Sequence, residues 1–181
     1  MSAMKPPITT RPASVADLDT LVANVQAGFD SYVEFAPAGW RPRRVADDAE
    51  WITMLLEAEG TWALLALADE QPVGHVSFYP ARARPPDDTR PITELPTIPG
   101  VAHLWQLFVL PAWWGRGVAP LLHDASVTEM NRRGFTQTRL YTPAGHLRAR
   151  RFYERRGWSP VSDEFHPVLQ LVLTEYTRAL P

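Results

Sequence analysis

Cysteine is absent from all 181 residues of the chain. Its absence excludes disulfide bonds, cysteine–zinc sites and any mechanism that carries an acyl group on a thiolate. A strong charge of either sign is also missing, because the formal net charge is −2 and the sequence pI is about 6.2. Nucleic-acid binding requires a basic surface that neutralises phosphates, so we expect no nucleic acid as partner.

Long apolar runs and metal-binding motifs are missing as well. No run approaches the roughly 18 apolar residues of a membrane span, and Met1–Thr10 lacks the apolar core of a signal peptide. We therefore expect no membrane association and a cytoplasmic location. The five histidines show no HExxH-like spacing, so we expect no metal ion. With 45% hydrophobic residues, a chain of this length predicts one domain over residues 1–181.

The chain opens with a short strand and a helix. Residues 8–11 form a β-like segment, and Ser14 with Asp17 matches a capping box at a helix start. Apolar residues at helical spacing extend that helix over residues 15–33. Gly28 is expected to weaken the helix or to divide it in two.

A second helix and a hairpin follow. The helix is predicted over residues 45–59. Its buried stripe contains Trp51, Met54 and Leu55. Two apolar runs, residues 62–68 and 73–79, predict a hairpin. Residues 80–100 contain six prolines, which forbid a regular strand, so we expect a loop there and consider it as a lid.

The remaining segments alternate strands with helices. The strands are predicted over residues 101–110, 136–141 and 168–176, and the helices over a segment ending at Gly134 and over residues 147–156. This order predicts a mixed α/β fold. The closing strand offers an edge through which a homodimer could form.

The segment Val109–Pro120 joins the most strand-like run to a helix through Gly115 and Gly117. Pro120 falls in the first helical turn, where amides lack intrahelical acceptors. The N–H groups of residues 115–120 therefore point out of the helix start and form an anion site with the helix dipole. Glycines without Cβ atoms let a diphosphate approach the backbone closely. From these residues alone, an ordinary strand–turn–helix connection is the alternative.

The motif differs from the common nucleotide-binding loops. It lacks the Gly-Lys-Ser/Thr of a Walker loop and the third glycine of a dinucleotide fingerprint. Residues 107–119 instead resemble the acetyl-CoA motif of the GCN5-related N-acetyltransferases (GNAT). Residues 146–158 are similar to the second signature of that family, and the opening from Ile8 resembles its first strand and helix. The resemblance therefore spans nearly the whole chain.

The resemblance implies a GNAT fold, a three-layer α-β-α arrangement around a splayed mixed sheet. It also implies an N-acetyltransferase that moves acetyl from acetyl-CoA to a primary amine of a small molecule or peptide, by direct attack in a ternary complex. Carried over position by position, the family's cofactor site corresponds here to Leu107, Phe108, Val109, Gly115, Arg116, Gly117, Val118, Ala119, Pro120 and His146.

Two positions depart from the family pattern. Trp114 stands where the phosphate signature begins with Gln or Arg, so its side chain cannot offer the same polar group to phosphate. His146 stands in place of the usual Asn of the second motif. These departures favour an alternative function, a non-catalytic CoA-binding module of the same fold.

Tyr153 and His103 are the candidate catalytic residues. The resemblance places Tyr153 beside the cofactor sulfur, where it protonates the departing thiolate. His103 lies on the strand before the phosphate turn, and strand alternation predicts His103, Trp105 and Leu107 on one face. The ordinary histidine pKa of about 6.5 suits a base near pH 7, whereas Gln106 is neutral and cannot serve. The alternatives are a partly solvated His103 without a role and a water chain as the base.

Overall fold

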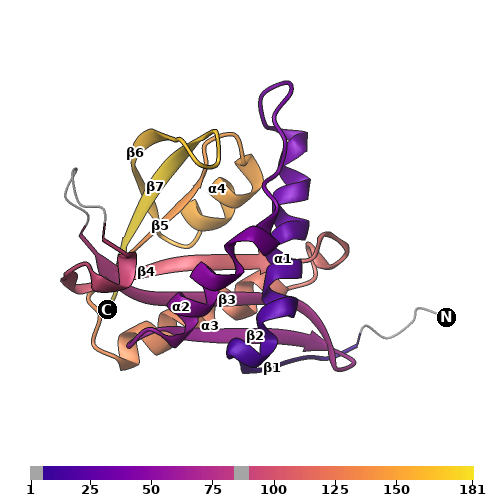
Figure 1. Cartoon of the computed structure of the whole chain (residues 1–181). Coiled ribbons are helices and arrows are strands. Elements are labelled where there is room, and N and C mark those ends of the chain that lie inside the picture. The colour runs from indigo at the N-terminus through magenta and orange to yellow at the C-terminus, as the bar shows by residue number, and fades with distance from the viewer. Residues whose placement is uncertain (1–5, 84–89) are drawn as a thin grey trace.

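The computed structural model describes residues 6–83 and 90–181. Seven strands form one sheet in the order β1-β2-β3-β4-β5-β7-β6 (Figure 1). The strands are β1 (Ile8–Pro12), β2 (Trp62–Ala68), β3 (Gln71–Arg82), β4 (Thr97–Val109), β5 (Gln137–Pro143), β6 (Ser159–His166) and β7 (Leu171–Ala179). All neighbours pair antiparallel except β4 and β5, which run parallel. The sheet is therefore mixed, as predicted.

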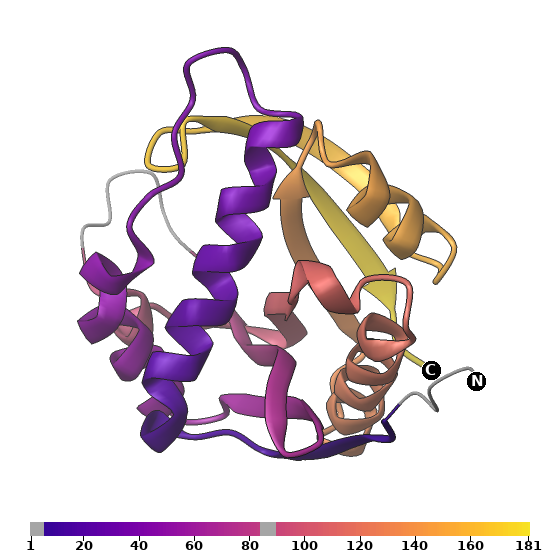
Figure 2. The same ribbon diagram turned by 90° about the vertical axis from the view of Figure 1, so that its right-hand side faces the viewer.

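Helices cover both faces of the sheet, which confirms the predicted three-layer arrangement. The α-helices of the described residues are α1 (Leu18–Ser31), α2 (Ala49–Glu57), α3 (Val118–Arg132) and α4 (Leu147–Glu154). Figures 1 and 2 show α1 and α2 on one face of the sheet and α3 on the other. Each face has its own hydrophobic cluster, one around Val25 and Ile52 and one around Phe78 and Leu122. None of the described helices is long and apolar enough to cross a bilayer.

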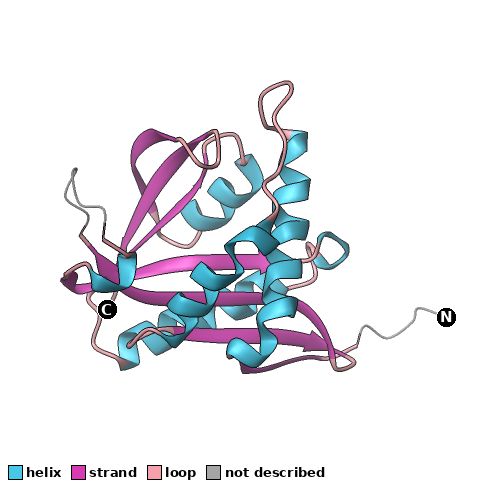
Figure 3. Ribbon diagram, in the orientation of Figure 1, coloured by secondary structure: helices cyan, strands magenta, loops and turns pink. Residues whose placement is uncertain are grey.

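Strands β4 and β5 stay paired over only part of their length. The parallel register runs from Val101 opposite Gln137 to His103 opposite Arg139, and it stops there. Beyond this point β5 pairs only with β7 and β4 only with β3, and the two strands separate in Figure 3. The second half of β4 therefore has one edge without a neighbouring strand.

A β-bulge at Trp105 changes which face the residues of β4 point to. Ser77 of β3 pairs with Gln106 and Phe78 pairs with Leu104, so Trp105 has no partner in the register. Such an extra residue breaks the alternation of a strand. Trp105 packs with the α1–α2 cluster, whereas Leu107 packs with the opposite one. The prediction that Leu107 shares a face with His103 and Trp105 is therefore wrong.

The proline-rich stretch is more regular than predicted. Strand β3 continues through Pro80, which pairs with Ala102, and ends at Arg82. The register shifts between Pro80 and Arg82, and such an irregularity accommodates a residue that lacks an N–H donor. The expected loop over residues 80–100 is therefore shorter at both ends. Residues 84–89, a part of the expected lid, lie outside the described residues.

The last part of the chain holds a strand that the sequence pattern did not predict. Strand β6 lies at the edge of the sheet, and nearly all of its residues are exposed. It carries no apolar alternation, because no face of it is buried. The closing strand β7 begins at Leu171, three residues after the predicted start at residue 168.

The N-terminal helices differ from prediction at two residues. The capping box is confirmed, since the Ser14 N–H donates to Asp17 Oδ2 at 3.0 Å. Gly28 does not divide α1: it is buried inside the helix, and a Cβ atom there would overlap the Phe108 ring of β4. Trp51 is not on the buried stripe of α2. It is 42% exposed, and Ile52 takes its place in the core.

We expect Gly28→Ala to destabilise the fold. Alanine favours a helix over glycine by up to about 1 kcal/mol, but overlap with a packed ring costs about 1–3 kcal/mol, and the overlap should dominate. Urea unfolding measures the difference. The double variant Gly28→Ala with Phe108→Leu should recover part of the loss, since it removes the ring. A stabilised single variant would contradict the close packing of α1 on β4.

Candidate active site

The turn between β4 and α3 presents backbone amides without partners. Gly115 and Gly117 have φ angles of 71° and 87°, in the left-handed region that glycine adopts without strain. The Leu121 N–H donates to the Gly117 carbonyl at 3.2 Å as α3 begins. Within the described part of the chain, the amides of residues 115–119 meet no backbone acceptor. These N–H groups and the helix dipole form an anion site.

A cavity of about 640 Å³ lies beside this turn, where β4 and β5 diverge. Its walls come from α1, the second half of β4, the β4–α3 turn, β5 and α4. A Cβ atom on Gly115 or Gly117 would meet no atom within 4 Å. Their positive φ angles, rather than crowding, therefore favour glycine, and the space beside the open amides is free for a ligand.

The cavity brings together most of the residues predicted for the site. Those that line it are Leu107, Phe108, Val109, Gly115, Gly117, Ala119, Pro120, His146 and Tyr153. Arg116, Val118 and His103 are not among the lining residues. Arg116 is exposed with its guanidinium over the Trp113 ring, and the Val118 side chain is buried in the core. Val118 still contributes its backbone amide to the turn.

Tyr153 is buried at the cavity wall, on α4. Its ring packs against Phe152 and Trp158, with centroids 5.3 and 5.7 Å away. Burial, and next the neighbouring Tyr32, raises the pKa of Tyr153 above its ordinary value of 10. The hydroxyl is therefore protonated at neutral pH. Within the described residues it has no hydrogen-bond partner, so the proton is available to a ligand in the cavity.

His103 is buried at the last residue pair between β4 and β5, just before the two strands separate. It is 8% exposed, and its Nδ1 atom has no hydrogen-bond partner among the described residues. Its ring lies between those of Tyr79 and Tyr141, at 5.1 and 5.5 Å. Burial and the nearby Arg139 charge lower the pKa of His103 to about 3, although a hydrogen bond to the Arg139 backbone opposes them. The imidazole is therefore neutral throughout the physiological range.

A buried polar network holds Gln106 in place. Asn24 Nδ2 donates to His75 Nδ1 at 3.3 Å, so His75 Nε2 carries the proton and donates to Gln106 Oε1 at 3.0 Å. Ser77 donates to the same oxygen at 3.4 Å. Burial lowers the pKa of His75 to about 4. Sequence reasoning missed this network, because its members come from α1, β3 and β4.

His146 closes the cavity at the start of α4. Its ring stacks on Phe35, with centroids 4.8 Å apart and planes at 17°, and meets Tyr32 edge-on at 5.5 Å. Burial, and next the Arg148 charge, lowers the pKa of His146 to about 4. A neutral imidazole keeps one donor and one acceptor nitrogen.

Sequence reasoning also missed the cations of the cavity. Arg148, Arg155 and Arg156 line it, all from α4 or its C-terminal end. Their spacing of seven and eight residues puts them on one side of a helix. This spacing in the sequence, together with the predicted anion site, could have indicated that the three arginines face the same ligand.

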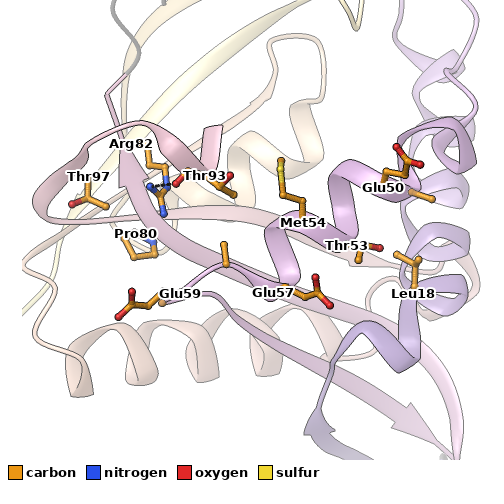
Figure 4. Close-up of a pocket in the computed structure, with 13 residues that line it drawn as sticks. Leu18, Glu50, Thr53, Met54, Glu57, Glu59, Pro80, Arg82, Thr93 and Thr97 are labelled. Atoms are coloured by element: carbon orange, nitrogen blue, oxygen red, sulfur yellow. Dashed lines mark hydrogen bonds between the residues drawn. The ribbon is translucent and has the colours of Figure 1, made fainter. Parts of the chain in front are cut away.

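A second, larger groove lies along α2 (Figure 4). Its volume is about 1090 Å³, and Glu50, Glu57 and Glu59 contribute carboxylates to its wall. Arg82 is fixed there, because its guanidinium donates to the Thr93 carbonyl at 2.9 Å. The groove shares no lining residue with the cavity at the β4–α3 turn. The open amides and Tyr153 therefore identify the smaller cavity as the candidate active site.

Comparison with known proteins identifies the family of the chain. The model of the family described as Acetyltransferase (GNAT) family matches residues 25–158, most of the chain. The chain belongs to the GNAT acetyltransferase family. Its members are acetyl-CoA-dependent acetyltransferases, and the chain is an enzyme of this kind. No curated protein matches the chain in sequence.

Solved structures share the GNAT fold at low sequence identity. A PaiA N-acetyltransferase from Thermoplasma acidophilum, in complex with coenzyme A, is 16% identical at a TM-score of 0.67, covering 96% of this chain and 99% of that one. A GNAT acetyltransferase from Staphylococcus aureus Mu50 is 17% identical at a TM-score of 0.69, and the match covers 97% of this chain and 100% of that one. The ribosomal-protein-S18-alanine N-acetyltransferase from Escherichia coli is 13% identical at a TM-score of 0.63, and the match covers 96% of this chain and 94% of that one. These likenesses confirm the predicted fold.

The cavity suits coenzyme A chemically. The open amides of the turn and the three arginines match the charge of phosphate groups. The second half of β4 presents an edge without a neighbouring strand, so its backbone groups on that side are available to an amide-containing chain such as pantetheine.

We expect the buried histidines to make the fold sensitive to acid. His75 and His103 have folded pKa values of about 4 and about 3, below the unfolded value of 6.5. Below pH 6.5 the unfolded chain therefore binds protons that the folded chain does not, so stability is present above pH 6.5 and is lost as pH falls towards 4. Each histidine should cost about 2 kcal/mol between pH 7 and 5. Urea unfolding at both values measures this.

The variant His103→Gln is the control for this effect. It removes one titrating group, so its loss of stability between pH 7 and 5 should be smaller than that of the unaltered chain by about 2 kcal/mol. An equal loss in both chains would show that His103 titrates normally in the fold.

Proposed function

We propose that the chain transfers the acetyl group of acetyl-CoA to a primary amine of a small molecule or peptide, by direct attack in a ternary complex. One observation carries the proposal: a single cavity joins the open amides of residues 115–119 with the protonated hydroxyl of Tyr153. The chain has no cysteine to hold an acyl group, which favours direct transfer.

The proposed roles follow from the placement of the residues. The amides of Gly115 to Ala119 bind the diphosphate, and the free edge of β4 near Leu107 to Val109 binds pantetheine and the thioester oxygen. When bound, acetyl-CoA supplies a thioester, in which a C–N bond to the amine replaces the C–S bond. His146 lines the same cavity and offers one ring nitrogen to the cofactor arm.

Tyr153 acts as the proton donor to the departing thiolate. An ordinary phenol has a pKa of about 10 and a thiol about 8.5, so complete transfer is uphill by about 2 kcal/mol in isolation. Burial raises the pKa of Tyr153 further. A hydrogen bond from the hydroxyl to the developing thiolate therefore does most of the work, and water completes the transfer.

The acceptor side of the cavity is aromatic. The lining rings come from the turn after α1, from β4 and from β5, and they are Tyr32, Trp105, Phe108 and Tyr141. Aromatic faces attract an ammonium ion and provide apolar contacts for the rest of an amine. An amine acceptor is also in keeping with solved GNAT neighbours, two of which are named as N-acetyltransferases of a ribosomal-protein alanine.

The alternative from the sequence, a non-catalytic CoA-binding module, is disfavoured by membership of an acetyltransferase family, and experiment tests it directly. Trp114 in the phosphate signature and the neutral Gln106 on β4 favour it, whereas Tyr153 favours catalysis. Calorimetry with CoA, followed by a thiol-release assay with acetyl-CoA and a panel of alkylamines, arylalkylamines and peptides, separates the two. Turnover with an amine supports the enzyme. Binding without turnover across the panel favours the module, and no binding of CoA overturns both.

We expect Tyr153→Phe to lower kcat by about 100-fold or more, because it removes a general acid but keeps the packed ring. The dissociation constant for CoA should stay within about twofold. Stopped-flow or steady-state thiol release gives kcat, and calorimetry gives the affinity.

Tyr176→Phe is the matched control for Tyr153→Phe. The Tyr176 ring lies 6.2 Å from that of Tyr153, but its hydroxyl donates to Glu154 and does not line the cavity. This variant should lose stability and keep its kcat. Equal kcat values in the unaltered chain and Tyr153→Phe would remove Tyr153 from the mechanism.

We propose that His103 relays the amine proton through water to solvent, since an imidazole with a pKa of about 3 does not hold that proton at neutral pH. With a pKa of about 3 it is neutral at every pH from 5 to 9, so the profile of kcat/KM should rise towards the pKa of the amine without a bend near 6.5. His103→Gln should lower kcat/KM by a similar factor across this range. An unaltered rate in His103→Gln would leave the base to another group.

A further inference from the structure

Trp114 is fixed across the phosphate turn. Its indole N–H donates to the carbonyl of Val109 at 2.8 Å, and Val109 is the last residue of β4. The ring also lines the cavity beside Gly115 and Gly117. The bond to Val109 therefore holds the indole at the edge of the open amides.

Arg148 lies on the indole of Trp114. Its guanidinium carbon is 4.2 Å from the ring centroid, within the range of a cation–π contact. Arg148 is exposed at the start of α4 and lines the same cavity. Among the described residues it forms no ion pair or hydrogen bond, so its five N–H donors are free. The contact with Trp114 limits where these donors lie.

The other stacked arginines of this region differ from Arg148. Arg156 stacks on Phe152 at 4.1 Å, but its Nε atom also lies 3.9 Å from Asp124. Arg116 stacks on Trp113 at 5.1 Å, outside the residues that line the cavity. Arg148 alone of these three combines a stacked guanidinium, a place in the cavity wall and no described carboxylate partner.

We propose that Arg148, held by Trp114, is a phosphate ligand for the diphosphate of coenzyme A. The phosphate signature carries no cation at Trp114, and α4 supplies one to the same place. Trp114 is then a positioning residue and Arg148 a binding residue, and we refer to the two as the Trp114–Arg148 pair. This inference rests on the proposed function, since it concerns the same cofactor.

The test measures CoA affinity by calorimetry, with Arg151→Ala as the matched control. Arg151 is exposed on the same helix but does not line the cavity, so this variant removes the same charge from the same element. Arg148→Ala should weaken CoA binding by about 10- to 100-fold, the loss of one charged hydrogen-bond pair. Arg151→Ala should bind within about twofold of the unaltered chain. Equal affinities for Arg148→Ala and Arg151→Ala would overturn the proposal.

Salt dependence and coupling distinguish a ligand from a merely structural residue. A lost phosphate contact should reduce the slope of log Kd against log salt concentration in Arg148→Ala, because salt then screens one charge pair fewer. Trp114→Phe keeps a ring but loses the bond to Val109, and it should weaken binding less than Arg148→Ala. Trp114→Phe combined with Arg148→Ala should bind like Arg148→Ala alone, because the two act as a unit. Fully additive losses of CoA affinity in the double variant, or an unchanged salt slope in Arg148→Ala, would contradict the proposed role of the Trp114–Arg148 pair.

Dephospho-CoA separates the two phosphate sources of the cofactor, because it keeps the diphosphate and lacks the 3′-phosphate. The loss caused by Arg148→Ala should be the same with CoA and dephospho-CoA. A loss that disappears with dephospho-CoA would overturn the assignment to the diphosphate. If the unaltered chain binds neither compound, the proposed function itself fails. If the unaltered chain binds CoA and Arg148→Ala binds it equally well, only the role of Arg148 fails.

Discussion

The structure depends on the early end of pairing between β4 and β5. Three residue pairs hold the parallel strands together, the last of them His103 with Arg139, and then the strands part. Unpaired strand edges are costly unless other groups satisfy them. The bulge at Trp105 and the packing of Phe108 on Gly28 fix β4 without help from β5. The cavity follows directly, and it exposes the β4–α3 turn and α4 to the same space.

The sequence predicts those parts of the candidate site whose residues lie next to one another along the chain. The turn with Gly115 and Gly117 combines glycine, a helix start and a strand end within a few positions, and its conformation follows from local chemistry. The bulge at Trp105 could not be predicted, because it depends on the register with β3. Trp51 looked like a core residue for a similar reason: its exposure depends on how α2 meets the sheet. Strand β6 could not be predicted from the sequence, because a strand at an exposed edge carries no pattern of buried apolar residues.

Charge is divided between two regions of the site. The interior carries polar groups that stay neutral, since Asn24, His75 and Gln106 satisfy one another and burial keeps the imidazole uncharged. The cations lie at the cavity wall formed by α4, where Arg148 and Arg155 remain exposed to water. In the proposed complex, the charged end of the ligand meets solvated arginines, and the reacting end meets the uncharged Tyr153 and His146 in a drier environment, where hydrogen bonds are stronger.

The close contact of Gly28 with Phe108 joins α1 to β4 at the wall of the cavity. Because no side chain larger than hydrogen fits between them, α1 and β4 leave no space at this point of the cavity wall. Under the proposed function, the wall can differ in size at the end of α1, at Ser31 and Tyr32, or on β5. The contact at Gly28 then sets the minimum separation of helix and strand, and under the proposed function the choice of acceptor is decided at the rim of the cavity.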